Sequence, residues 1–166
     1  MGTSRPPVTF CLEQALGHRT HGQNIEAALS GREVDPRVVR VEQPQSERLR
    51  LPWALRGSRL ALSRLRAAKA HGPVFFHTQT ISLFAPAAVR GAPYVVSVDA
   101  TPLQVDSMAR WYRHRPGPRL IEHAKTGWYR SVLARATAVV AWSDWATASL
   151  ERDYGVPRDK VLVAHP

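Results

Sequence analysis

Short apolar runs alternate along this chain with segments whose apolar residues recur at helical spacing. Most of the runs are uncharged and rich in valine, which is typical of strands that are buried on both faces of a sheet. Strands that alternate with helices form βαβ units, and these units build a parallel sheet. The sequence therefore predicts an α/β, Rossmann-like fold, with a mostly parallel sheet and helices on both of its faces. We expect strands at residues 8–12, 37–42, 74–77, 94–98, 138–142 and 161–164.

The clearest helix is predicted between Trp53 and Ala70, where leucines fall on one side and arginines on another at a spacing of about 3.6 residues. We expect further helices at residues 24–29, 81–89, 119–135 and 144–154, the last capped by Ser143. The connecting segments are expected to be a long turn at 13–23, a polar linker at 43–50 and a long irregular loop at 99–118.

Several classes of protein are excluded by simple counts. The single cysteine, Cys11, excludes an internal disulfide and a cysteine-rich zinc module. No apolar run approaches the roughly 18 residues that a membrane span needs, and the N-terminal segment lacks the apolar core of a secretory signal. A length of 166 residues suits one domain. We therefore expect one domain over residues 1–166 of a cytoplasmic protein.

The chain is strongly basic, with 23 lysines and arginines against 13 acidic residues and a net charge of +10. Such a charge attracts anions, whether nucleic acid, anionic lipid or a phosphorylated substrate. Twenty of the 23 basic residues are arginines, which suit bidentate phosphate recognition. An arginine- and alanine-rich composition also arises from coding bias alone, so the charge by itself does not choose among these ligands.

Polar residues follow four of the predicted strands. In open parallel sheets ligands bind beyond the carboxyl ends of the strands, so these residues are expected to meet at one edge. The candidate substrate-binding residues are Gly17, His18, Thr20, His21 and Asn24 after the first strand, His77 and Gln79 after the third, Thr101 after the fourth and Ser143 after the fifth.

Asp99, directly after the fourth predicted strand, is the candidate catalytic residue. A carboxylate there accepts hydrogen bonds from hydroxyls or acts as a base, although an Asx turn is the structural alternative. His18 and His21 are three residues apart, but a metal needs at least one further supported ligand, so we expect no metal site. His77 also fits a histidine that merely ends a strand. The glycines do not form a GxGxxG fingerprint, and tight turns would explain them as well.

Two basic segments raise the question of a membrane. Seven basic residues and no acidic one occur from Arg48 to Lys69. A helix with such a face fits an anionic lipid surface, and it equally fits the solvated outer side of a helix that packs on a core. Arg110–Arg115 is a second basic and aromatic cluster, suited to phosphate contacts or to a surface loop. Peripheral attachment at the inner face of a membrane therefore stays open.

The order of several segments resembles the N-terminal domain of family 4 glycosyltransferases, which have the two-domain GT-B fold. The resemblance covers roughly residues 8–166. It rests on the stretches 17–24 (GHRTHGQN), 74–78 (VFFHT), 92–102 (APYVVSVDATP), 136–143 (ATAVVAWS) and 154–163 (YGVPRDKVLV). Two positions depart from the common pattern of the family. Gly17 is followed by His18 rather than by a second glycine, and Asp99 stands where many members have a histidine.

The resemblance implies transfer of a sugar from a nucleotide-sugar to a sugar or lipid-linked acceptor, usually with retention of configuration. It implies no cofactor beyond the nucleotide-sugar, which the family binds mainly through a C-terminal domain. The chain ends directly after an apolar strand that a complete doubly wound domain would cover with a helix. We therefore expect the acceptor-side half of a two-domain enzyme, inactive by itself, whose partner is its own C-terminal domain.

Two other readings remain from the residues alone. The first is a basic Rossmann-like module that binds nucleic acid or anionic lipid without catalysis. No RNA-recognition or zinc-finger signature supports it, so no specific nucleic-acid partner is expected. The second is another sugar- or nucleotide-handling enzyme of the same architecture, because a fold does not fix a function.

Overall fold

The computed structural model describes residues 7–15, 17–30, 36–42, 52–108 and 118–165. Within them, six strands form one parallel sheet in the order β2-β1-β3-β4-β5-β6. The predicted α/β, Rossmann-like fold is confirmed, and every predicted strand is present with its ends shifted by at most one residue. The strands are β1 (Thr9–Glu13), β2 (Arg37–Val41), β3 (Val74–Phe76), β4 (Tyr94–Val98), β5 (Ala138–Ala141) and β6 (Val161–Val163).

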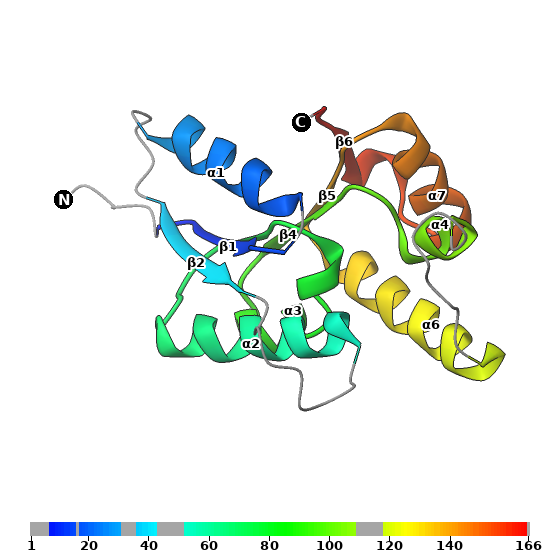
Figure 1. Cartoon of the computed structure of the whole chain (residues 1–166), viewed down its shortest axis with the longest axis horizontal. Helices are drawn as coiled ribbons and strands as arrows, with labels where there is room; N and C mark the ends of the chain where they lie inside the picture. Colours follow the sequence, from blue (N-terminus) through cyan, green and yellow to red (C-terminus); the bar gives the residue numbers. More distant parts are fainter. Residues whose placement is uncertain (1–6, 16, 31–35, 43–51, 109–117, 166) are drawn as a thin grey trace.

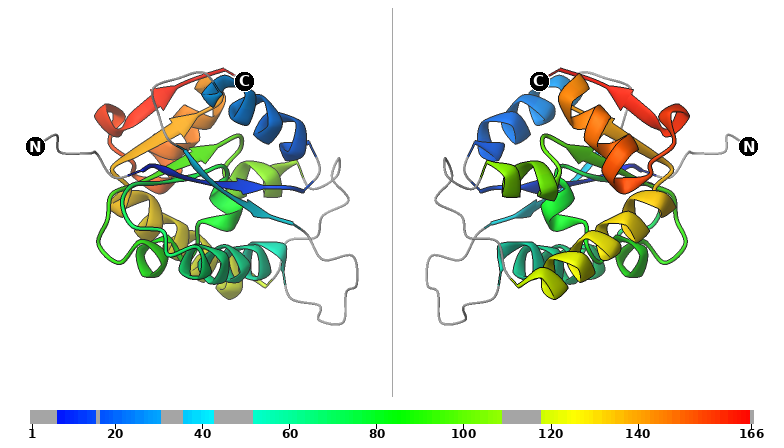
Figure 2. Two further views of the ribbon diagram at one scale, coloured as in Figure 1. Left: turned by 90° about the vertical axis from the view of Figure 1, so that its left-hand side faces the viewer. Right: turned by 90° about the vertical axis from the view of Figure 1, so that its right-hand side faces the viewer.

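Helices cover both faces of this sheet (Figures 1 and 2). One face carries α1 (His18–Leu29). The other carries α2 (Trp53–Ala67), α3 (Ala85–Val89), α6 (Arg119–Arg135) and α7 (Asp144–Tyr154). This division follows from right-handed crossovers, because only the β1-to-β2 connection runs toward the β2 edge of the sheet. Shorter elements are α4 (Pro102–Ser107), η1 (Gln79–Ile81) and η2 (Arg158–Lys160).

The core lies between the sheet and its helices. Apolar residues of β3 and β4, such as Phe76 and Val96, are buried against Leu65 of α2, Leu133 of α6 and Leu150 of α7. The helix predicted between Trp53 and Ala70 is confirmed, and its leucine side faces this core. Among the described residues, no helix combines the length and the apolarity that crossing a bilayer requires.

Three predicted segments differ from the structure. The long turn at 13–23 is wrong because α1 already begins at His18, and Gly22 lies within it. A Cβ at Gly22 would lie 3.7 Å from the His77 ring and 3.9 Å from Leu12, so this glycine permits close helix packing rather than a turn. Only residues 85–89 of the predicted helix at 81–89 are α-helical, after the 3-10 turn η1.

The third difference is at 99–118, predicted as an irregular loop. Residues 102–107 form α4, which begins with a reciprocal capping box between Thr101 and Gln104. Residues 109–117, with the whole basic and aromatic cluster Arg110–Arg115, lie outside the described residues, as does the linker at 43–50.

The strand order reverses between β1 and β3. From β1 the chain moves outward to β2 and then crosses back to β3 on the other side of β1. The connections that leave β1 and β3 therefore diverge to opposite faces of the sheet, and this opens a crevice at their carboxyl ends. In a doubly wound sheet, such a switch point is where ligands bind.

Candidate functional site

Four connections bring polar or aromatic side chains to the carboxyl ends of the central strands. His18 begins α1 after β1, His77 follows β3, Asp99 follows β4 and Trp142 follows β5. These four and Glu13, the last residue of β1, are in mutual contact. We call the group, with His21 of α1, the switch-point cluster. It lies at the reversal of strand order.

His18 lies between two carboxylates. Its Nδ1 is 3.2 Å from Glu13 Oε2, and its Nε2 is 3.3 Å from Asp99 Oδ2. Burial of the imidazole disfavours its charged form, but the contacts with Asp99 and Glu13 outweigh this and raise the pKa of His18 to about 9. His18 is therefore an imidazolium at neutral pH, held in place from both ends of its ring.

Glu13 is the buried member of this arrangement, with 1% of its surface exposed. The Trp53 indole N–H donates to one carboxylate oxygen, and the Thr78 hydroxyl donates to the other, which also faces His18. Burial alone would raise the pKa of Glu13, but the hydrogen bonds from His18, Thr78 and Trp53 lower it below its ordinary value. The carboxylate is thus kept ionised inside the protein, and the sequence analysis did not identify it.

His21 and His77 form a second, neutral pair. The His21 Nδ1 and His77 Nε2 atoms are 2.8 Å apart, so one ring donates to the other. Burial and the neighbouring imidazoles lower the pKa of His77 to about 4, and burial with His18 nearby lowers that of His21. Trp142 packs edge-on against His21, with ring centroids 4.2 Å apart, and its indole donates to Ser97 Oγ at 2.6 Å.

Asp99 is the more exposed of the two carboxylates. Its side chain is 33% exposed against 2% for Glu13, and 19% for His18. Burial would raise the pKa of Asp99, but His18 and nearby backbone amides lower it, so the group is an anion at neutral pH and a weak base. Two carboxylates and one imidazolium leave the cluster with a net charge of −1. Such a surface accepts hydrogen bonds from hydroxyls and repels phosphate.

The other predicted substrate-binding residues fall into two groups. Gly17, Thr20 and Asn24 are exposed at the start of α1 and along it. The second group uses its polar atoms inside the protein. Gln79 donates to Ala100 O at 2.6 Å, Thr101 bonds Ser149 at 2.7 Å, and Ser143 accepts from Ala146 N at 3.1 Å.

These internal bonds give the second group a structural role in shaping the crevice. Gln79 fixes the loop that carries Asp99, while Thr101 and Ser143 cap α4 and α7. Direct contact of these three residues with a ligand stays a prediction. Within the described ranges, no three histidine, cysteine or acidic side chains are arranged to hold a metal ion.

Comparison with known proteins gives one result. The family model of Glycosyltransferase Family 4 matches residues 11–166, a span that contains the last three residues of β1, every element from α1 to β6 and the whole switch-point cluster. No curated protein matches the chain.

Proposed function

The chain belongs to glycosyltransferase family 4, and on that premise we propose that the switch-point cluster binds the acceptor of a retaining, nucleotide-sugar-dependent glycosyltransferase. The observation that carries the proposal is the ionised Asp99, held by the His18 imidazolium at the mouth of the crevice. An acceptor presents hydroxyl groups, and an anionic carboxylate is a strong acceptor for their hydrogen bonds.

Each residue of the cluster has a distinct part in this proposal. Asp99 accepts a hydrogen bond from an acceptor hydroxyl and so orients the attacking oxygen. His18 fixes the Asp99 side chain and keeps it charged, while buried Glu13 fixes His18 from its other nitrogen. The low pKa of Asp99 makes it an orienting group rather than a general base.

In this proposal, the nucleotide-sugar donor binds to a different part of the enzyme. A nucleotide-sugar carries a diphosphate, which a cluster of net charge −1 repels, so we propose that a separate donor-binding domain holds it opposite this crevice. The leaving diphosphate would then be stabilised by cationic groups and helix N-termini of that domain. The 166-residue chain alone is accordingly expected to release no nucleotide from a panel of nucleotide-sugars.

Asp99 provides the direct test, in the enzyme that carries both domains. Loss of one charge-assisted hydrogen bond to the reacting hydroxyl should lower the transfer rate of Asp99→Ala by about 10- to 100-fold. Nucleotide release from the best donor of the panel measures this rate. Asp159→Asn, at an exposed position in η2, is the matched control and should keep the parent rate. A parent-like rate in folded Asp99→Ala would remove Asp99 from the site.

A further inference from the structure

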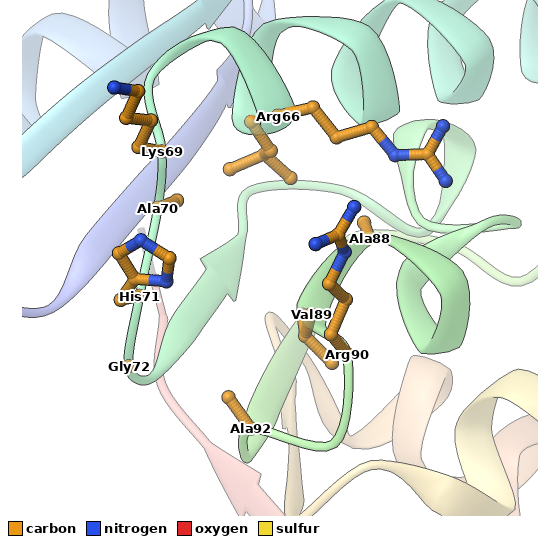
Figure 3. Close-up of a pocket in the computed structure, with 10 residues that line it drawn as sticks. Arg66, Lys69, Ala70, His71, Gly72, Ala88, Val89, Arg90 and Ala92 are labelled. Atoms are coloured by element: carbon orange, nitrogen blue, oxygen red, sulfur yellow. The ribbon is translucent and has the colours of Figure 1, made fainter.

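A hollow of about 290 Å³ lies between the ends of α2 and α3 (Figure 3). Its walls come from residues 65–72 and 88–92, which lead into β3 and β4. Because the sheet is parallel, these residues lie at the amino ends of the strands. The hollow is therefore on the opposite edge of the sheet from Asp99, and nothing in the proposed function uses it.

The lining of this hollow divides into a basic rim and an apolar floor. The basic rim consists of Arg66, Lys69, His71 and Arg90, and the floor of Leu65, Ala88, Val89 and Ala92. None of the lining residues is acidic. Figure 3 shows the Arg66 and Arg90 side chains extending over one side of the hollow, with Lys69 and His71 on the other.

The cations of the basic rim lack counter-charges among the described residues. In the part of the chain that the structure describes, the side chains of Arg66, Lys69 and Arg90 form no hydrogen bond or ion pair. Elsewhere arginines of this chain do find partners, as Arg40 does with Glu26. Like charges gathered around one space repel each other, and an anion in that space removes the repulsion.

Helix capping is the simpler explanation for basic residues at these positions, since cations favour helix C-termini. For α2 that role is already taken, because Arg37 donates to the carbonyls of Ala68 at 2.7 Å and Lys69 at 3.1 Å. Lys69 and Arg90 also have φ values of 46° and 48°, in the left-handed region that favours glycine or asparagine. Among the described residues, neither the Lys69 nor the Arg90 side chain donates a hydrogen bond to a helix end, so capping does not account for the two charges.

We propose that this hollow binds a phosphomonoester carried on a small carbon group. Guanidinium and ammonium groups are the usual partners of phosphate oxygens, and the basic rim supplies them. The apolar floor suits the carbon part of the ligand. The volume is at the lower end of the roughly 300–1,000 Å³ of small-molecule sites, which favours a ligand of a few carbons over a large one.

Glycerol 3-phosphate is the probe for a soluble phosphomonoester, and glycerol is its uncharged control. Titration of the 166-residue chain should shift the backbone amides of residues 69–72 and 88–92 in nuclear magnetic resonance spectra, while glycerol leaves them unchanged. Vesicles of phosphatidylcholine with and without phosphatidic acid test the same chemistry presented as a lipid headgroup. Binding of either phosphomonoester at these amides supports the proposal.

A pair of variants makes the test specific. The double variant Arg66→Gln/Arg90→Gln should weaken binding of the responding probe by at least about tenfold, through loss of charge-assisted hydrogen bonds. The control Arg59→Gln/Arg119→Gln removes the same charge from exposed positions of α2 and α6 outside the hollow, and should bind within about twofold of the parent. Absence of binding by both probes, or equal binding by the two double variants, would overturn the proposal.

Discussion

The two edges of the sheet treat charge in opposite ways. At the carboxyl ends of the strands, the switch-point cluster pairs one imidazolium with two carboxylates and keeps a net charge of −1. At the amino ends, the basic rim gathers cations around a hollow that no described acidic residue lines. One edge therefore holds paired charges and suits hydroxyl groups, whereas the other holds cations without counter-charges among the described residues and suits an anion.

This difference shows why the total charge of a basic chain is a poor guide to where that chain binds an anion. The protein carries +10 overall, yet the cluster at its switch point is negative. From the total charge alone, phosphate binding would have been assigned to the crevice. The basic rim, which we propose as the phosphate site, lies at the opposite edge of the sheet.

The strongest test of internal balance is Glu13→Ala. This change leaves the Trp53 indole and the Thr78 hydroxyl without their acceptor and removes one of the two anions beside His18. Loss of one partner from a buried ionic network should lower the free energy of unfolding by about 3 kcal/mol, as measured by urea denaturation.

Two comparisons sharpen this result. Asp99→Ala removes one contact from a side chain that is one-third exposed, and should cost less than about 1 kcal/mol. Glu151→Ala, at an exposed position of α7, should change stability by less than about 0.5 kcal/mol. A Glu13→Ala protein as stable as Glu151→Ala would show that the cluster is not an interdependent network.

The next largest effect is a pH dependence of the free energy of unfolding, with an alkaline limb and an acid limb. His18 has a pKa of about 9 in the folded protein against an ordinary 6.5, so its stabilisation is full below pH 6.5 and is lost as the pH rises through 9. His77 has a folded pKa of about 4 against 6.5, so its stabilisation is full above pH 6.5 and is lost as the pH falls toward 4. Each limb should amount to about 3 kcal/mol.

Unfolding free energies between pH 4 and 10 would measure these limbs. His18→Gln should flatten the alkaline limb and also shorten the acid limb, because the His18 imidazolium helps to lower the pKa of His77 and of His21, while His77→Gln should reduce the acid limb alone. His123→Gln, at an exposed position of α6, should reproduce the parent profile apart from a constant offset. An unchanged alkaline limb in His18→Gln would refute the carboxylate–imidazolium–carboxylate arrangement.

The smallest effect concerns the opposite edge, where Arg90→Gly should stabilise the fold. Glycine adopts the left-handed φ of position 90 without strain, so the gain should be about 0.5–1 kcal/mol in urea denaturation. Arg90→Ala removes the same charge but keeps the Cβ, and should show no such gain. The glycine variant should at the same time bind glycerol 3-phosphate less tightly, so a gain in stability without that loss would separate Arg90 from the proposed site.

Much of this arrangement could be predicted from the sequence, because parallel strands have only one edge at which their carboxyl ends meet. That rule brought His18, His77 and Asp99 together before any coordinates were known, although they are spread over residues 18–99. It did not predict that Thr20 and Asn24 lie on a helix, because Gly17 and Gly22 suggested a turn, and contact of these two residues with a ligand stays a prediction. The structure makes this segment a helix, which exposes both residues.

The residues that were missed depend on distant partners. Glu13 falls at the start of the predicted turn 13–23, but in the structure it ends β1, and its burial is tolerated only because donors arrive from positions 53 and 78. Trp142 is the last residue of a predicted strand, and its packing against His21 of α1 and against His77, which follows β3, has no local signature. The helix α4 did have a local sequence signature, because residues 101–104 match a capping box with proline at the first helical position.

The placement of β1 between β2 and β3 has a consequence for how the protein is made. Strand β1 leaves the ribosome before its inner neighbour β3 and must wait for it, because Cys11 pairs with Phe76, and Thr78 reaches Glu13 across 65 positions. Contacts this far apart along the chain close slowly. Until then the Glu13 carboxylate stays hydrated, and the nascent N-terminal segment has an open edge on which β-addition by another chain competes with folding.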